Sequence, residues 1–239
     1  MLFKHFSLLV TLSLLLSPFS LLHAQTRSQV YGDDLTKQAQ TLYVSAVTGM
    51  TTFESEAAGS KETQSTNGYE IGGWFGEARL VGLKVASHTD SVPYALNNSE
   101  SRQKFTDVRM AARLWWFTPS VGVSVSEVDI QQTGAKTVGL FGTGINAGLG
   151  VNVAVYKGVV VNADVMTVRS NNVYDKLSKQ SELGQRNEAD SHLAFDLTDR
   201  IIDLIVGYRK QDYTIATEDK TYAESSQGAY AGLRLGVYF

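Results

Sequence analysis

The stretch from Thr106 to Trp116, which reads TDVRMAARLWW, alternates apolar and polar side chains. Because successive side chains of a strand point to opposite faces, a period of two predicts a β-strand. One face of this strand is apolar, and the other carries Asp107, Arg109 and Arg113. The stretch therefore predicts a strand with one apolar face and one charged face.

The same period recurs along most of the chain. Ten strands are expected, at 41–53, 67–75, 79–89, 104–117, 120–130, 138–155, 159–170, 189–197, 201–215 and 227–239. About two hundred residues in such strands predict one domain. The expected fold is all-β, an antiparallel up-and-down barrel of about ten strands, with eight to twelve as the range.

The connections between these strands alternate in length. Tight turns are expected near Gly76–Ala78, Thr118–Pro119, Lys157–Gly158 and Thr198–Asp199, and longer polar loops at 54–66, 90–103, 131–137, 171–188 and 216–226. In the loop 171–188, Val173 and Leu177 have helical spacing and suggest a turn of helix. Short turns that alternate with longer loops are typical of a meander barrel in a bacterial outer membrane, with the turns facing the periplasm.

The amino-terminal region has the layout of a secretory signal peptide. A short basic segment precedes the apolar run 6–22, and Leu22-His23-Ala24 offers a cleavage site. A membrane anchor is the alternative, but Ser13, Ser17 and Pro18 interrupt the run. The expected organisation is a signal peptide at 1–24, a periplasmic segment at 25–40 and a barrel at 41–239.

Composition narrows the classes of function. Removal of residues 1–24 takes away one lysine and no acid, so the formal charge changes from −3 to −4, which does not favour nucleic acid as a partner. The chain has no cysteine, which excludes disulfides and thiolate metal sites. No HExxH or EF-hand pattern occurs, so no metal or cofactor is expected.

Proline and aromatic residues fit the expected barrel. Pro93 falls in an expected loop and Pro119 in an expected turn, where a missing N–H removes no ladder hydrogen bond. Aromatic residues fall at strand ends, with Phe75, Trp116, Phe195 and Phe239 on the turn side and Tyr69 and Phe141 toward the loops. Such positions suit the two membrane interfaces.

The stretch Gln227 to Phe239 resembles the carboxy-terminal assembly signal of bacterial outer-membrane β-barrel proteins. Its apolar face is Ala229, Ala231, Leu233, Leu235, Val237 and Phe239. The resemblance implies that Leu233, Leu235, Val237 and Phe239 are read by the barrel-assembly machinery, and that outer-membrane lipid surrounds the barrel. The alternative is a soluble periplasmic barrel or sandwich with the apolar face inward, because periodicity alone does not choose between the two.

If the apolar faces meet lipid, charged side chains fill the lumen. They are Glu70, Lys84, Asp107, Arg109, Arg113, Asp164, Asp190, Asp196, Asp203, Arg209 and Arg234. Side chains nearly fill so narrow a barrel, so we expect a paired charge network rather than a wide pore. Gly142, Gly144, Gly148 and Gly150 share one face of a strand and are expected to leave room for lumenal groups such as Trp74 or Trp115.

Two pairs of residues suggest a hydrolase. His88 with Asp90, and Asp190 with His192, stand two residues apart near the expected loop ends of their strands. Outer-membrane proteases of the omptin family use His and Asp at such a rim, but the adjacent Asp-His pattern of that family is absent and the loops are shorter. The leading hypothesis is a non-enzymatic barrel, structural or adhesive or passing small solutes through a narrow polar lumen. The alternatives are a rim hydrolase and a soluble periplasmic binding protein, and the ligand of any extracellular loop stays open.

Overall fold

The computed structural model describes residues 42–55, 60–75, 80–94, 99–132, 136–156, 158–175, 181–198, 201–216 and 221–237. The expected signal peptide, the segment 25–40 and Phe239 lie outside these residues. The described part contains ten strands: β1 (Leu42–Ser55), β2 (Ser60–Phe75), β3 (Val81–Tyr94), β4 (Ser99–Ala112), β5 (Phe117–Gln132), β6 (Lys136–Tyr156), β7 (Val159–Asp175), β8 (Ser181–Asp196), β9 (Ile202–Ala216) and β10 (Thr221–Val237). No helix among the described residues is long and apolar enough to cross a membrane.

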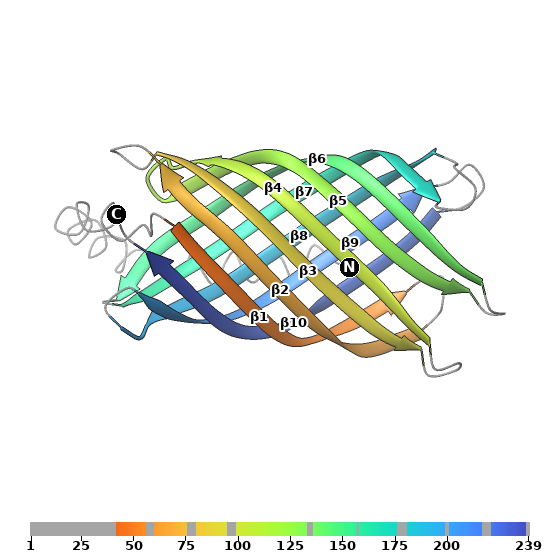
Figure 1. The fold of residues 1–239 in the computed structure, drawn as a ribbon, viewed down its shortest axis with the longest axis horizontal. Coiled ribbons are helices and arrows are strands. Elements are labelled where there is room, and N and C mark those ends of the chain that lie inside the picture. Colours follow the sequence, from red (N-terminus) through yellow and green to blue (C-terminus); the bar gives the residue numbers. More distant parts are fainter. Residues whose placement is uncertain are drawn as a thin grey trace, which may run out of the picture. The chain divides into compact units, whose positions relative to one another are not determined.

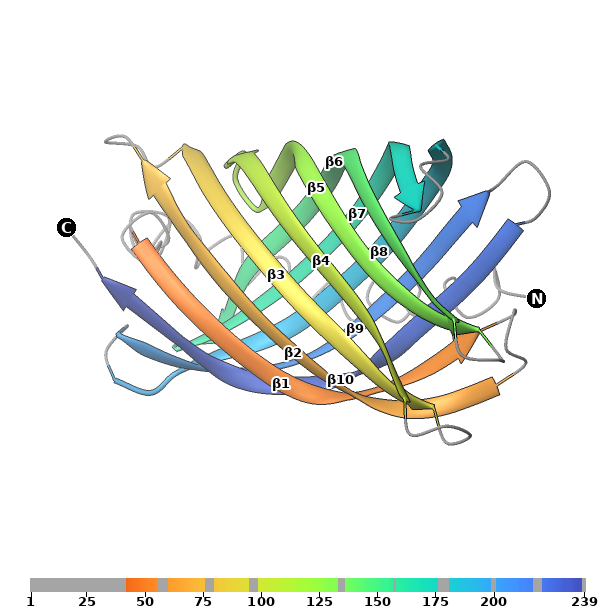
Figure 2. The ribbon, with the colours of Figure 1, turned by 45° about the vertical axis from the view of Figure 1, so that its right-hand side comes forward.

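The ten strands form one closed antiparallel sheet. Each strand pairs with the next along the chain, and β1 pairs with β10 from Leu42↔Val237 to Ser55↔Glu224. Figures 1 and 2 show the strands running obliquely around the barrel, the tilt that closure of a sheet requires. Every strand therefore has two neighbours and the sheet has no open edge. The expected up-and-down barrel of about ten strands is confirmed.

The strands are longer than expected at one end of the barrel. We call the end that carries Leu42 and Val237 the turn end, and the end that carries Ser55 and Thr221 the loop end. The strands β1 and β2 stay paired as far as Ser55↔Ser60, and most of 90–103, 171–188 and 216–226 also belongs to strands. The helical turn expected at Val173 is wrong, since Val173 belongs to β7, while Leu177 lies outside the described residues.

One tight turn lies a few residues before its expected place. Leu114 and Phe117 exchange backbone hydrogen bonds of 2.8 and 3.0 Å, so the turn is Trp115–Trp116 and the strand expected at 104–117 ends at Ala112. Trp115 has a φ of 64° and is 89% exposed. The turn expected at Thr118–Pro119 is therefore wrong, and Pro119 lies in β5, one residue before the first β4–β5 pair, Ala111↔Ser120. At this position β5 is not yet paired with β4, so the missing N–H of Pro119 removes no hydrogen bond between these two strands.

The other proline also lies in a strand. Pro93 was expected in a loop but belongs to β3, paired with Glu100 near the loop end. A proline near the end of a strand removes a hydrogen bond only where the ladder is about to stop.

The barrel is apolar outside and polar inside over its turn-end half. The outward side chains there, which we call the lipid belt, include Leu42, Val44, Ile71, Leu83, Val108, Met110, Val121, Val123, Ile145, Leu149, Val165, Leu193, Val206, Leu233, Leu235 and Val237, each 37–69% exposed. On β4, the alternate residues Asp107 and Arg109 point inward and are buried. An apolar exterior around a polar interior is the arrangement of an outer-membrane β-barrel, and the soluble alternative with its apolar face inward is wrong.

The lipid belt stops at a ring of polar outward side chains, which we call the collar. The polar outward residues at the edge of the belt are Thr48, Asn67, Ser87, Thr106, Glu127, Thr143, Thr167, Asn187, Lys210 and Gln227; on β8, Ser191 is a polar outward residue within the belt itself. Hydrogen bonds join collar residues on neighbouring strands, including Thr48 Oγ1 to Asn67 Oδ1 at 2.9 Å. Past the collar, Met50 and Phe141 are the large apolar outward side chains among those described.

The strands continue beyond the collar toward the loop end. On β2, Asn67 is followed back to Ser60, which corresponds to roughly 18 Å along the barrel axis at about 3.3 Å per residue and a tilt near 40°. Both faces of this part are largely polar, as Thr63, Gln64, Ser65 and Thr66 illustrate. The barrel therefore extends past the hydrocarbon layer as a polar sheet.

A charge placed in the lipid belt should destabilise the barrel much more than one placed in the collar. Val121 lies at the middle of the outward apolar run of β5, so we expect Val121→Arg to cost about 2–4 kcal/mol in a bilayer. Gln227→Arg on the collar should cost less than about 1 kcal/mol. Reversible urea unfolding in lipid vesicles measures both, and equal costs would contradict the assignment of belt and collar.

Candidate functional site: the lumen

The turn-end half of the lumen holds a connected set of charged side chains. Tyr43 donates to Glu70 at 2.7 Å, and Lys84 Nζ lies 2.6 Å from the same carboxylate. Lys84 is also 4.0 Å from Asp164, which accepts from Arg109 Nη1 at 2.7 Å. Since Arg109 lies on β4 and Asp164 on β7, these contacts cross the lumen.

The set continues around the opposite wall. Asp190 accepts from Tyr230 at 2.7 Å and from Arg209 Nε at 3.1 Å, and lies 3.1 Å from His192 Nδ1. His192 Nε2 is 3.3 Å from Arg234 Nη2, and the Arg234 guanidinium lies over the Tyr43 ring at 5.1 Å. We call the connected set the turn-end network: Tyr43, Glu70, Lys84, Arg109, Asp164, Asp190, His192, Arg209, Tyr230 and Arg234.

A second group crosses the middle of the lumen. Asp107 on β4 is bound by Arg186 on β8 and by the Ser124 hydroxyl, and Asn146 donates to Ser124 at 2.9 Å. The side chains of Arg186 and Asp107 are 1% and 3% exposed. An ion pair this deeply buried persists only when both charges are matched.

Aromatic rings pack in the lumen at the same position along the barrel axis. The Arg186 guanidinium lies 4.5 Å from the centre of the Phe105 ring, and Phe105 is wholly buried. Phe105 contacts His88 and meets Tyr213 edge to face at 5.6 Å. His88 Nε2 lies 2.7 Å from Gln211 Oε1 across the barrel. Glu188 Oε2 lies 3.9 Å from the same His88 nitrogen. We call these residues the central cluster: His88, Phe105, Asp107, Ser124, Asn146, Arg186, Glu188, Gln211 and Tyr213.

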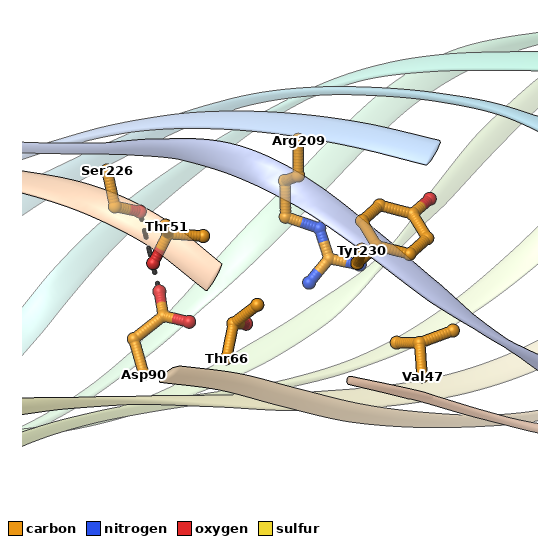
Figure 3. Close-up of a pocket in the computed structure, with 7 residues that line it drawn as sticks. All are labelled: Val47, Thr51, Thr66, Asp90, Arg209, Ser226 and Tyr230. Atoms are coloured by element: carbon orange, nitrogen blue, oxygen red, sulfur yellow. Dashed lines mark hydrogen bonds between the residues drawn. The ribbon is translucent and has the colours of Figure 1, made fainter. Parts of the chain in front are cut away.

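Toward the loop end, further polar contacts cross from β10. Gln103 on β4 donates to Glu224, and the Ser226 hydroxyl donates to Asp90 at 3.4 Å. Beside the Asp90–Ser226 contact lies a cavity of about 10 Å³, which is lined by Val47, Thr51, Thr66, Asp90, Arg209, Ser226 and Tyr230 (Figure 3). Contacts thus span the lumen at three levels.

The structure brings together most of the charges expected from the sequence. Glu70, Lys84, Arg109, Asp164, Arg209 and Arg234 share one network, while Asp107 belongs to the central cluster. Asp203 stands opposite Arg234 in the β9–β10 register and opposite Asp196 in the β8–β9 register. Arg113 lies just past the end of β4, and its guanidinium lies 4.1 Å from the centre of the Trp74 ring.

The glycines on β6 leave room for lumenal groups, as expected, but these groups are not the two tryptophans. Trp115 is in an exposed turn, and Trp74 lies over Gly82 on the neighbouring strand, so neither ring fills the space beside β6. A side chain at Gly148 would meet Ser120 and Arg109, and one at Gly150 would meet Thr118. The glycines therefore leave room for hydroxyls and for an arginine of the turn-end network.

The histidine pairs do not form a rim site. His88 is the eighth residue of β3, and its Nε2 is hydrogen-bonded to Gln211 rather than to Asp90. Asp190 and His192 are bonded to each other, but they lie toward the turn end of β8 and are tied to Arg209, Tyr230 and Arg234. The expectation of pairs near the loop ends is wrong because the strands continue beyond them.

One group in the lumen has the donor types of a metal site. Ligand atoms of His88, Asp107 and Glu188 lie within 4.8 Å of one another. However, Asp107 is held by Arg186 and Ser124, His88 is held by Gln211, and Arg209 Nε lies 3.7 Å from Glu188. A cation would have to replace these contacts beside two guanidinium groups, so the arrangement fits an ion-pair cluster better than a metal centre.

Several members of the central cluster were missed at the level of sequence. Arg186 and Glu188 fall in the stretch 171–188 that was expected to be a loop, and Gln211 and Tyr213 were not recognised as lumenal. A usable signal was the continuation of the period: Gly184, Arg186, Glu188, Asp190 and His192 fall on one face of β8. The outward side chains of this stretch, Gln185, Asn187, Ala189 and Ser191, are polar or small, so a contrast in hydrophobicity between the two faces did not indicate a strand.

Comparison with known proteins gives likenesses of structure only. No family model matches the chain, and no curated protein matches it. Neisserial surface protein A is similar at 11% identity and a TM-score of 0.40, over 83% of this chain and 99% of that one. The outer membrane protease OmpT from Escherichia coli is similar at 9% identity and a TM-score of 0.46, over 82% and 96%. Ail of Yersinia pestis is similar at 8% identity and a TM-score of 0.33, over 82% and 99%.

The pair Asp107–Arg186 should show strong coupling when its members are changed singly and together. Asp107→Asn or Arg186→Met leaves a buried charge unpaired, so each should cost about 3–5 kcal/mol. The double variant should cost clearly less than the sum of the two. Urea unfolding in vesicles measures the cycle, and strict additivity would contradict a buried pair.

The control for this cycle is the exposed pair Lys104–Glu127, whose side chains are 39% and 43% exposed and 3.9 Å apart. Because solvent screens such a pair, Lys104→Ala should cost less than about 1 kcal/mol.

Proposed function

We propose that this protein is a non-conducting outer-membrane barrel that anchors and displays its loop end, in a structural or adhesive role. The observation that carries the proposal is that side chains from opposite walls meet at three levels of the lumen. Arg109 meets Asp164, Asp107 meets Arg186, and Asp90 meets Ser226.

The physical basis is the narrow bore of the barrel. A closed sheet of about this size has an interior that side chains can fill. Conduction needs sites that an ion can both enter and leave. Here, Lys84 is paired with Glu70, Arg109 with Asp164 and Arg186 with Asp107, so a passing solute would have to break buried pairs. A free path for small solutes is therefore not part of the proposal.

The polar extension beyond the collar supports a role in display. It raises the loop end by roughly 18 Å above the collar, and the paired strands make it stiff. Such a support suits contact with another surface or molecule better than catalysis. Of the residues expected in a rim hydrolase, Asp190 and His192 belong to the turn-end network, His88 belongs to the central cluster, and Asp90 accepts a hydrogen bond from Ser226.

The conduction test uses the purified full chain in planar bilayers. We expect no stable single-channel steps in concentrated KCl, because the central cluster blocks the lumen. The matched variant combines Phe105→Ala with Arg186→Ala and clears only the central level; it should stay closed as well, because Arg109–Asp164 and Asp90–Ser226 still cross the lumen. Large, steady currents from the unaltered protein would contradict the proposal.

We also propose that the last strand serves as the assembly signal, with barrel-assembly machinery and outer-membrane lipid as partners. The support is the outward apolar face of β10, where Leu233, Leu235 and Val237 are about half exposed. Since β10 closes the sheet against β1, slow recognition of this strand would delay closure.

Deletion of Phe239 should slow insertion without changing the fold of the molecules that insert. We expect a several-fold lower outer-membrane level and more periplasmic degradation, because the variant loses one residue of the proposed assembly signal while the β1–β10 pairing remains. Cell fractionation and heat-modifiable gel migration measure this. A truncated chain that accumulates as a folded soluble protein in the periplasm would contradict the membrane assignment.

A further inference from the structure

The cavity beside Asp90 brings together polar atoms that lack partners. Asp90 Oδ1 and Thr51 Oγ1 are buried and have no hydrogen-bond partner among the described residues, and both side chains line the cavity. Asp90 is 3% exposed and Thr51 is 5% exposed. A buried polar atom without a partner costs free energy, so these two atoms indicate that a group is bound between them.

The dimensions of the cavity limit what that group is. A volume of about 10 Å³ corresponds to space for roughly one water molecule. A buried water usually makes two to four hydrogen bonds, and this site offers a carboxylate, the hydroxyls of Thr51, Thr66 and Ser226, and a guanidinium.

The charges around the cavity select water over a metal cation. Figure 3 shows the Asp90 carboxylate and the Arg209 guanidinium directed at the same space from opposite sides. A cation in that space would be repelled by Arg209, whereas a water can accept from Arg209 and donate to Asp90. The remaining Asp90 oxygen, Oδ2, already accepts from Ser226 at 3.4 Å.

We infer that this cavity is a binding site for one structural water molecule, held by Asp90, Thr51 and Arg209. The water joins Asp90 to Arg209 as a solvent-separated ion pair. Because Arg209 is bonded to Asp190, the water links the loop-end side of the lumen to the turn-end network. The inference goes beyond the proposed function, since it concerns hydration of the lumen and stands whether or not the barrel conducts.

The substitution Thr51→Val distinguishes a wet site from a dry one. Valine keeps the shape of threonine but has no hydroxyl. If a water is bound, the variant loses one of its partners, and the apparent melting temperature should fall by about 2–4 °C. If the cavity is empty, the variant removes an unsatisfied hydroxyl, and the melting temperature should rise. A rise would overturn the inference.

The matched control is Thr52→Val, the neighbouring position on the outer face of β1. Its side chain does not line the cavity, so the melting temperature should change by less than about 1 °C. Melting is followed by circular dichroism of the full chain in one detergent, with all variants prepared in the same way.

Two further measurements do not depend on a variant. Melting in NaCl, KCl and choline chloride at equal ionic strength should give the same temperature; stabilisation by one metal cation alone would overturn the choice of water. A high-resolution crystal structure of the unaltered protein should show one peak within hydrogen-bond distance of Asp90 Oδ1 and Thr51 Oγ1. An empty cavity at that resolution would also overturn the inference.

Discussion

The pairing of β1 with β10 is the constraint on which the rest of the barrel depends. In the hydrocarbon layer, an N–H or C=O group without a partner costs several kcal/mol, so a sheet crosses it only when closed. The fourteen residues of β1 pair with β10 along their whole length. Once the ring is closed, the turn-end half of each strand has one face toward lipid and the other enclosed, which explains why apolar and charged faces separate there.

The closed barrel shields its lumen from water, and this determines how the charged side chains inside are arranged. A charge there has lost most of its water, so it needs a partner, and the nearest partner is often on the opposite wall. Glycines make this crowding feasible: a side chain at Gly207 would collide with Tyr230 and His192, and one at Gly72 with Tyr43. The glycines and the long side chains therefore pack against one another and leave little room for a solute.

Sequence reasoning succeeded where hydrophobicity distinguishes the two faces of a strand. The belt halves of β4 and β10 could be read in this way, since Val108 and Met110 face lipid while Asp107 and Arg109 face the lumen. The loop-end halves of the strands could not be predicted in this way. Both of their faces are polar beyond the collar, so alternate residues do not differ in hydrophobicity. Partners across the lumen, such as Arg186 for Asp107, depend on barrel curvature and strand register, which no local pattern contains.

The most direct test of an apolar exterior around a filled polar lumen uses single cysteines, since the chain has none of its own. Nitroxide labels at consecutive positions 229–235 of β10 would be compared for collisions with oxygen, which partitions into lipid, and with a water-soluble relaxant. If the exterior meets lipid and the lumen is filled, oxygen accessibility is high at Ala229, Ala231, Leu233 and Leu235, and accessibility to both reagents is low at Gly232 and Arg234. High accessibility of the inward positions to the water-soluble reagent would show an open aqueous lumen and contradict a filled one.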